Sequence, residues 1–146
     1  MATCKNKPAF LVESCLLTFG LVSVSEAALA ESWRAAGLDG APLCWIKDGE
    51  ITVGTMEEYL PFRASRPSGK FALDDIDAAL AGRLSGALTA SGTMEVCRRL
   101  GVRCAVSGGI GGIGDVKGEE LCPDLPALRD LPVALVCTSP KDMLDI

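Results

Sequence analysis

The stretch that decides the fold of this chain lies near its C-terminus and reads Pro132-Val133-Ala134-Leu135-Val136-Cys137-Thr138-Ser139-Pro140-Lys141. Its apolar, β-branched run followed by small residues predicts a strand over 131–137 that ends in a turn. Lys141 then stands where a following helix would begin. Because ligands bind at the carboxyl ends of strands in open α/β sheets, this lysine is a candidate functional residue.

An amine at such a position has two possible roles. Partial burial and the positive end of a helix both disfavour its charged form, which makes the amine a better nucleophile, able to form a Schiff base with a carbonyl. The alternative is a surface lysine at the start of a helix. Position alone leaves both roles open for Lys141.

Outward from this strand, the chain alternates between strand and helix patterns. Strands are predicted over 9–12, 43–47, 50–54, 87–90 and 102–106, and helices over 25–36, 73–84 and 93–100, with a helical turn at 55–58, a flexible polar loop at 63–69 and a last turn at 141–146. Asp48-Gly49 is a strong hairpin signal. The pattern predicts an α/β fold: a layered, largely parallel sheet with flanking helices and one β-hairpin. We expect a loose tail over 1–7 and a single α/β domain over 8–146.

The predicted last strand needs other parts of a protein to cover its two faces. A parallel strand this apolar is normally covered on both faces, and the sequence after it holds barely one turn of helix. We therefore expect the fold to be incomplete by itself. Self-association is one way to complete it, and the loss of a second half present in a longer ancestor is the other explanation.

Composition narrows the classes of function. The 146 residues are 49% hydrophobic and carry a formal charge of −5, which predicts one folded domain and argues against a nucleic-acid partner. A small phosphorylated ligand remains possible, because a few cations and backbone amides suffice to bind it. The absence of histidine excludes Ser-His-Asp and Cys-His catalysis.

Location in the cell is indicated by three further features. No apolar stretch approaches the roughly 18 residues that cross a bilayer, so we expect no membrane association. The start of the chain also lacks a clear signal-peptide pattern. The seven cysteines are odd in number, scattered, and never spaced as Cys-x-x-Cys. A reducing, cytoplasmic location is therefore predicted.

Charged and glycine-rich segments supply further candidates. Glu13 ends an apolar strand, where a charge is costly unless it is paired, for example with Lys70, or used for acid/base chemistry. Gly109, Gly111 and Gly114 match a dinucleotide-binding pattern, but residues 115–120 show no helical repeat to follow it. A close backbone approach to some other ligand, or a structural turn, fits the glycines better.

An acidic cluster follows the glycines and consists of Glu119, Glu120 and Asp124. Such oxygen ligands suit Mg²⁺ or Mn²⁺, although a solvated loop has the same composition. Spacing alone does not choose between a metal site and a solvated loop.

Taken in order, several segments resemble one known family, the pseudouridine-5′-phosphate glycosidases, also called the indigoidine synthase A-like family. The segments are Phe10-Leu11-Val12-Glu13-Ser14-Cys15-Leu16-Leu17-Thr18-Phe19-Gly20, Lys47-Asp48-Gly49-Glu50-Ile51-Thr52-Val53-Gly54, Lys70 with Asp75, Ser107-Gly108-Gly109-Ile110-Gly111-Gly112 and the run from Val133 to Ile146. Their order and approximate spacing are similar to those of the family along nearly the whole chain.

The resemblance implies a reaction: reversible cleavage of the carbon–carbon glycosidic bond of pseudouridine 5′-phosphate to uracil and ribose 5-phosphate. It implies that Lys141 forms the Schiff base and that Glu13 is the proton donor. The substrate contacts it implies are Lys70, Ala90, Cys122 and Asp124, and Glu120 would bind Mn²⁺. The expected partner is thus a small phosphorylated nucleoside or sugar phosphate, and the expected assembly is a homo-oligomer, a trimer by resemblance.

The chain also departs from the family pattern. The family is roughly twice as long, Phe19 replaces a histidine, and Phe71-Ala72-Leu73 replaces Ser-Arg-Arg after the substrate lysine. A His-Arg pair after the glycine loop is missing. Two hypotheses follow. One is a shortened glycosidase that works as an oligomer, and the other is a catalytically inactive relative that binds a sugar phosphate or pairs with a full-length subunit.

Overall fold

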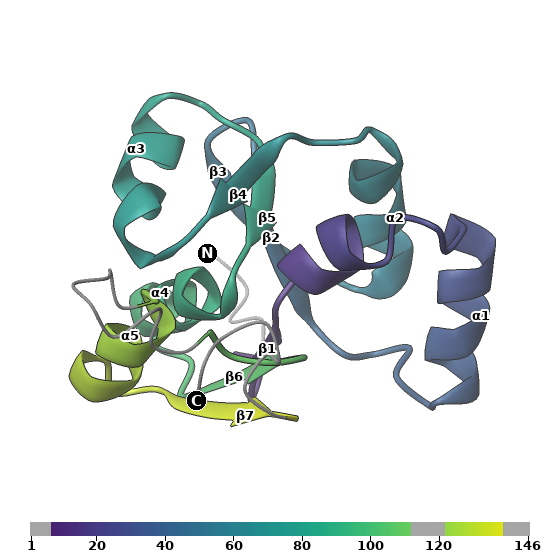
Figure 1. The fold of residues 1–146 in the computed structure, drawn as a ribbon. Helices are drawn as coiled ribbons and strands as arrows, with labels where there is room; N and C mark the ends of the chain where they lie inside the picture. Colours follow the sequence, from purple (N-terminus) through teal and green to yellow (C-terminus); the bar gives the residue numbers. More distant parts are fainter. Residues whose placement is uncertain (1–6, 112–121, 139–146) are drawn as a thin grey trace, which may run out of the picture.

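A strongly curled sheet runs through the computed structural model, which describes residues 7–111 and 122–138 (Figure 1). Within those residues the strand order is β4-β5-β2-β1-β6-β7, and β3 pairs with β2. The strands are β1 (Leu11–Val12), β2 (Leu43–Lys47), β3 (Glu50–Gly54), β4 (Gly69–Phe71), β5 (Gly86–Leu88), β6 (Cys104–Ser107) and β7 (Ala134–Cys137). The β1–β2, β1–β6, β6–β7 and β4–β5 pairs are parallel, and β2 is antiparallel to β3 and β5. The predicted α/β fold with a largely parallel sheet and one hairpin is confirmed.

Helices pack around this sheet in two groups. They are α1 (Glu26–Ala35), α2 (Met56–Ala64), α3 (Ile76–Ala81), α4 (Ala90–Leu100) and α5 (Asp124–Asp130), with short helical segments η1 (Leu16–Gly20) and η2 (Leu73–Asp75). In Figure 1, α1, α2 and η1 gather on one side of the molecule. The α4 and α5 helices pack together on the other side, where α4 contacts β1, β5 and β6. None of the described helices is long and apolar enough to cross a membrane.

Each group of helices encloses its own hydrophobic core. The core beneath α4 contains Leu11, Cys44, Ile46, Leu88, Met94 and Ala105, all of them inaccessible to solvent. The second core joins α1 and α2 to β2 through Leu29, Trp45, Tyr59 and Phe62. The Trp45 ring lies 5.6 Å from Tyr59 and 5.8 Å from Phe62 between centroids. Since β2 contributes side chains to both cores, it holds the two groups of helices together.

Local signals in the sequence predicted the best-defined elements. The hairpin turns at Asp48 and Gly49, whose φ angles of 52° and 78° are those of a turn that matches strand twist. Ser25 caps α1 by accepting the N–H of Ala28 at 3.2 Å. The capping box at Thr55 is present, with Glu58 accepting the Thr55 N–H at 2.8 Å.

Other parts of the prediction were wrong or incomplete. Arg63 lies in the last turn of α2 and is buried, so the flexible loop predicted over 63–69 is shorter than expected. The helix predicted from 93 begins at Ala90, because the Thr89 hydroxyl caps it by accepting the Gly92 N–H. The elements β4, α5 and η1 were not predicted. The helical turn predicted at 141–146 and nearly all of the tail predicted over 1–7 lie outside the described residues.

Candidate active site

Three parallel strands bring their carboxyl ends to one edge of the sheet. Val12 of β1 pairs with Val106 of β6, which in turn pairs with Val136 of β7. The strand geometry of β1 continues one residue further, since Glu13 donates its backbone N–H to Val106 O at 2.9 Å. Glu13 and Ser107 are therefore neighbours at this edge, as expected for ligand-binding residues in a parallel sheet.

Glu13 is a buried carboxylate held by a serine. Its side chain is on the same face of β1 as Leu11, two residues earlier, and is 5% exposed. Its Oε2 lies 2.7 Å from the Ser107 hydroxyl. That hydroxyl also lies 2.7 Å from Gly109 O and accepts the Gly109 N–H at 3.1 Å. Ser107 thus links the carboxylate to the segment Gly108–Gly111, which we call the glycine loop.

A second strand end reaches the same region from the other half of the sheet. The hydroxyl of Ser14, the residue after Glu13, accepts the N–H of Leu88 at the end of β5 at 3.0 Å. Two residues later Ala90 begins α4 and is 3% exposed. The N-terminus of α4, whose backbone N–H groups attract negative charge, is therefore close to the strand end that carries Glu13.

Asp124 fixes the glycine loop to the start of α4. It is 4% exposed, and its Oδ1 accepts the Ser91 N–H at 2.8 Å while Oδ2 accepts the Gly111 N–H at 2.9 Å. Half-buried Cys122 packs against the same loop, because a Cβ placed on Gly111 would collide with its Sγ. The predicted residues Asp124, Cys122 and Ala90 are thus gathered around Gly111 and the start of α4.

The remaining predicted residues fall at the border of this region or beyond the described part of the chain. Lys70 is an exposed residue of β4. The next residue, Phe71, accepts the Thr89 N–H at 3.0 Å, which places the end of β4 beside the start of α4. Lys141 and Glu120 lie outside the described residues. The chain that leads to Lys141 leaves β7 at Thr138, whose hydroxyl donates to Gly108 O.

The buried thiols near β1 are not suited to act as nucleophiles. Burial raises the pKa of Cys97 to about 12, with the neighbouring Cys104 as a further cause. Burial likewise raises the pKa of Cys44, and Cys97 adds to that effect. Both thiols therefore stay neutral and act as small apolar side chains in the core.

The described residues do not by themselves form a manganese site. Among residues 7–111 and 122–138 no three His, Cys, Asp or Glu side chains cluster as metal ligands. Both Asp124 oxygens already accept backbone N–H groups. The Mn²⁺ prediction therefore depends on Glu120, which lies outside this part of the chain.

Ser107 and Ser14 are the site residues whose roles were not predicted from sequence. Both stood inside segments that indicated the site, yet a serine among glycines or after a glutamate carries no distinctive signal alone. The one feature that could have indicated Ser107 is its position at the end of a strand, because that strand could pair with the strand that ends at Glu13. That pairing becomes visible only once the sheet order is known.

Comparison with known proteins identifies the family of this chain. Residues 1–146 match the family described as Indigoidine synthase A like protein. A pseudouridine-5′-phosphate glycosidase of Alkaliphilus metalliredigens is 32% identical over 99% of this chain and 49% of its own length. The glycosidase of Methylobacterium nodulans is 33% identical over 95% of this chain and 43% of its own length. The chain spans about half the length of these curated relatives.

Solved structures show the same fold. An indigoidine synthase A-like protein of Thermotoga maritima superposes with a TM-score of 0.80 and 25% identity, covering 95% of this chain and 48% of that one. A prealnumycin C-glycosynthase in complex with ribulose 5-phosphate superposes with a TM-score of 0.73 and 29% identity, over 94% of this chain and 46% of that one. The chain belongs to the indigoidine synthase A-like protein family and corresponds to the N-terminal half of its pseudouridine-5′-phosphate glycosidase members.

Proposed function

We propose that this chain carries the reacting groups of a C-glycosidase that converts pseudouridine 5′-phosphate to uracil and ribose 5-phosphate, and the reverse. The observation that carries the proposal is the buried Glu13 carboxylate, fixed by Ser107 at the edge where β1, β6 and β7 end. Glycosidases named for this reaction match the chain almost throughout, and a C-glycosynthase with a sugar phosphate bound shares its fold.

Lys141 and Glu13 divide the chemistry between them. In the synthetic direction the Lys141 amine condenses with the aldehyde of ring-opened ribose 5-phosphate, giving an imine and water. Carbon 5 of uracil then attacks the imine carbon, which is carbon 1 of the sugar, and the proton on carbon 5 goes to the Glu13 carboxylate. The 4-hydroxyl of the sugar closes the ring on carbon 1, the bond from carbon 1 to the Lys141 nitrogen breaks, and the hydroxyl proton leaves with the free amine. Cleavage reverses these steps: the electrons of the broken bond return to carbon 5 together with the proton from Glu13.

The position of Glu13 suits this proton transfer. A general acid must stay within hydrogen-bonding reach of one atom of the substrate, and the bond to Ser107 restricts the carboxylate in this way. The β7 strand lies two strands from β1, on the far side of β6, so the chain toward Lys141 starts at the same edge of the sheet. No histidine is required in either role.

Phosphate and metal binding complete the proposal. Lys70 and the backbone at the start of α4, at Ala90, would contact the sugar phosphate, with Cys122 and Asp124 holding the glycine loop against it. Glu120 would bind Mn²⁺, which would supply positive charge near the phosphorylated substrate. Assembly as a homotrimer is part of the same proposal.

A synthesis assay tests this function. Purified protein is incubated with uracil, ribose 5-phosphate and Mn²⁺, and pseudouridine 5′-phosphate is sought by chromatography. Product is expected from the wild type and from Lys47→Ala, an exposed hairpin variant, while Glu13→Gln lowers the rate by about 10² to 10⁴. Lys141→Ala is expected to give no product.

The assay is run with the chain alone and with the polypeptide that corresponds to the unmatched half of the Alkaliphilus metalliredigens relative. Absence of product from folded wild-type protein in both would contradict the proposal. If ribose 5-phosphate still bound in a calorimeter, the protein would be an inactive sugar-phosphate-binding relative.

A further inference from the structure

A small cavity lies between η1, the start of α1 and the C-terminal end of α2. Its volume is about 230 Å³, and its lining includes Phe19, Val22, Glu26, Arg63, Arg66 and Pro67. The lining contains neither Glu13, Ser107 nor Lys70. The cavity is therefore separate from the candidate active site, and no role described so far uses it.

The charges on the wall of this cavity do not balance. Arg63 is 6% exposed, and its ion pair with Glu26 at 2.7 Å is neutral as a pair. Arg66 is exposed, and it forms no ion pair with any other residue in the ranges 7–111 and 122–138. The cavity therefore has one surplus positive charge, which favours a ligand with a single negative charge.

Buried Arg63 also keeps one hydrogen-bond donor for a ligand. A guanidinium group carries five N–H groups. Nε and Nη2 of Arg63 donate to three backbone carbonyls, and Nη1 donates to the Glu26 carboxylate. The second N–H of Nη1 has no acceptor within the described part of the chain. Arg63 and Arg66 can thus both donate to an anion in this cavity.

The remainder of the wall is apolar. Phe19 is 38% exposed and Val22 is 63% exposed, and Pro67 lies beside Arg66 on the same wall. A ligand that covers these side chains would remove apolar surface from water. Phe19 stands where the family pattern has a histidine, so this apolar wall is a feature of the present chain and not of the family pattern.

Charge and size together define the class of ligand. A carboxylate carries one negative charge, and its two oxygens match the paired N–H groups of a guanidinium. A phosphate monoester carries about −1.5 to −2 at neutral pH, which exceeds the surplus charge of the cavity. The cavity, at about 230 Å³, is smaller than the roughly 300 to 1,000 Å³ of pockets that hold drug-sized ligands. A single ring that bears a carboxylate meets these conditions.

We propose that the cavity between η1, α1 and α2 is a binding site for a small aromatic carboxylate. The carboxylate accepts N–H groups of Arg66 and the remaining N–H of Arg63, and the ring packs against Phe19 and Val22. The inference is independent of the proposed reaction, because no residue of this cavity takes part in that chemistry.

Calorimetric titration of the chain with benzoate tests this site. Saturable binding of one benzoate per chain is expected. Benzyl alcohol and benzylamine should bind at least about tenfold more weakly, because they have the ring without the negative charge. Arg66→Gln is expected to lower the affinity for benzoate by about tenfold or more. Arg83→Gln is the matched control, since Arg83 is also exposed, has a similar φ of 53° and lies outside the lining.

Two further variants separate this site from other ways of binding benzoate. Phe19→Ala is expected to lower the affinity by about threefold to tenfold, because the ring contact is lost. Lys70→Gln is expected to bind benzoate as the wild type does, since Lys70 belongs to the candidate active site. Circular dichroism establishes that each variant is folded.

Three results would overturn the proposal. One is the absence of saturable benzoate binding by folded wild-type protein. The second is an unchanged affinity in Arg66→Gln, or a loss of the same size in Arg83→Gln. The third is loss of binding in Lys70→Gln, which would place benzoate in the candidate active site.

Discussion

The carboxylate of Glu13 and the hydroxyl of Ser107 lie 2.7 Å apart, although 94 residues separate them in the sequence. The parallel pairing of β1 with β6 creates this contact, because it aligns the residues that follow Val12 and Val106. The fold therefore positions a buried acid without any local sequence motif. Loss of the Ser107 hydroxyl should lower the stability of the protein and release the Glu13 carboxylate from its fixed position.

Ser107→Ala removes a hydroxyl that hydrogen-bonds to the buried Glu13 carboxylate and to the Gly109 backbone. We expect the free energy of unfolding to fall by about 1 to 3 kcal/mol, since two buried hydrogen bonds of this hydroxyl are lost. Urea denaturation measures this change, and Ser32→Ala on the exposed face of α1 is the matched control. Equal stabilities of Ser107→Ala and the control would show that the contact contributes nothing.

Gly92 allows α4 to start against the end of β4. A Cβ at this position would collide with the carbonyl oxygen of Phe71, so Gly92→Ala must push the helix away from the strand. We expect a loss of about 1 to 3 kcal/mol. Gly40→Ala is the control, because nothing lies within 4 Å of its added Cβ. If both variants melt at the same temperature, the close approach of α4 to β4 is wrong.

Arg63 fastens the segment between η1 and α1 to α2. Its side chain is 6% exposed and donates to the carbonyls of Leu17, Leu21 and Val24 at 2.6 to 2.8 Å, and it pairs with Glu26 at 2.7 Å. Arg63→Ala is expected to cost about 3 kcal/mol or more, because it leaves several carbonyls without a donor.

Arg34→Ala is the control for this substitution. Arg34 forms a surface ion pair at 4.0 Å with 71% of each side chain exposed, so its loss should matter little. Thermal unfolding compares the two variants. Similar losses of stability in both variants would show that the hydrogen bonds of Arg63 do not stabilise the fold.

Glu95 makes stability depend on pH. Hydrogen bonds from Arg98, and then from Arg99, hold the pKa of Glu95 below its usual value of 4.5. Its contribution is therefore present above the pKa of the unfolded chain and is lost as pH falls through the lower folded-state value. The stability advantage of wild type over Glu95→Gln should hold at neutral pH and shrink below about pH 4.5.

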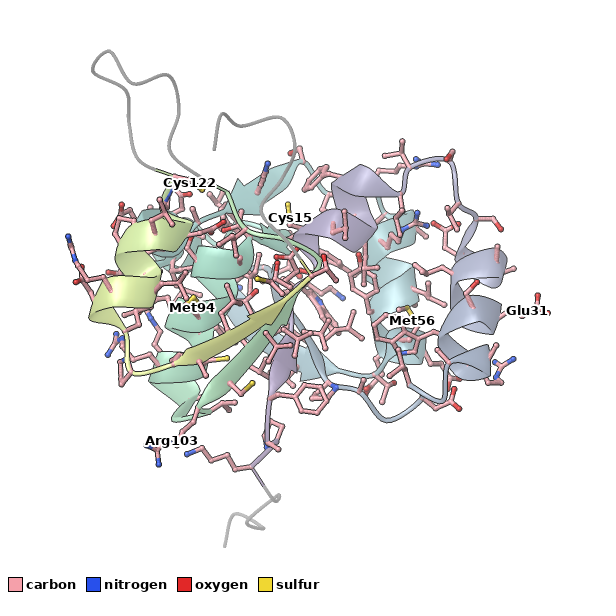
Figure 2. All side chains as sticks on the ribbon, turned by 60° about the horizontal axis from the view of Figure 1, so that its bottom comes forward. Cys15, Glu31, Met56, Met94, Arg103 and Cys122 are labelled. Carbon is pink, nitrogen blue, oxygen red and sulfur yellow. The ribbon has the colours of Figure 1, made fainter. Side chains whose placement is uncertain are left out.

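Urea titrations at several pH values measure this difference. Glu31→Gln, exposed on α1, is the control for a simple change of charge (Figure 2). A difference between wild type and Glu95→Gln that stays constant into acid would contradict the linkage.

Much of the fold could be predicted from local signals in the sequence. The Asp48-Gly49 turn, the Ser25 cap and the apolar strand before Cys137 each depend on neighbouring residues only. Elements fixed by distant contacts were missed. Strand β4 exists because it pairs with β5, and the burial of Arg63 depends on backbone carbonyls at least 39 residues away.

The candidate site, like the fold, could be predicted from the sequence only in part. Glu13 stood out because a charge ended an apolar strand, and its burial bears out the expectation that such a charge must be satisfied. The structure adds a serine partner, Ser107, which the sequence did not indicate and which only the sheet order reveals. The roles of Lys141, Lys70 and Glu120 remain predictions from the family resemblance.

Trapping of the sugar on the protein tests the central claim most directly. The chain is incubated with ribose 5-phosphate, reduced with borohydride and digested, and the modified lysine is located by mass spectrometry. The account predicts a reduced sugar adduct on Lys141 in the wild type and also in Glu13→Gln, because imine formation precedes the proton transfer at carbon. Absence of the adduct, or its presence on Lys70 with Lys141 unmodified, would contradict the account.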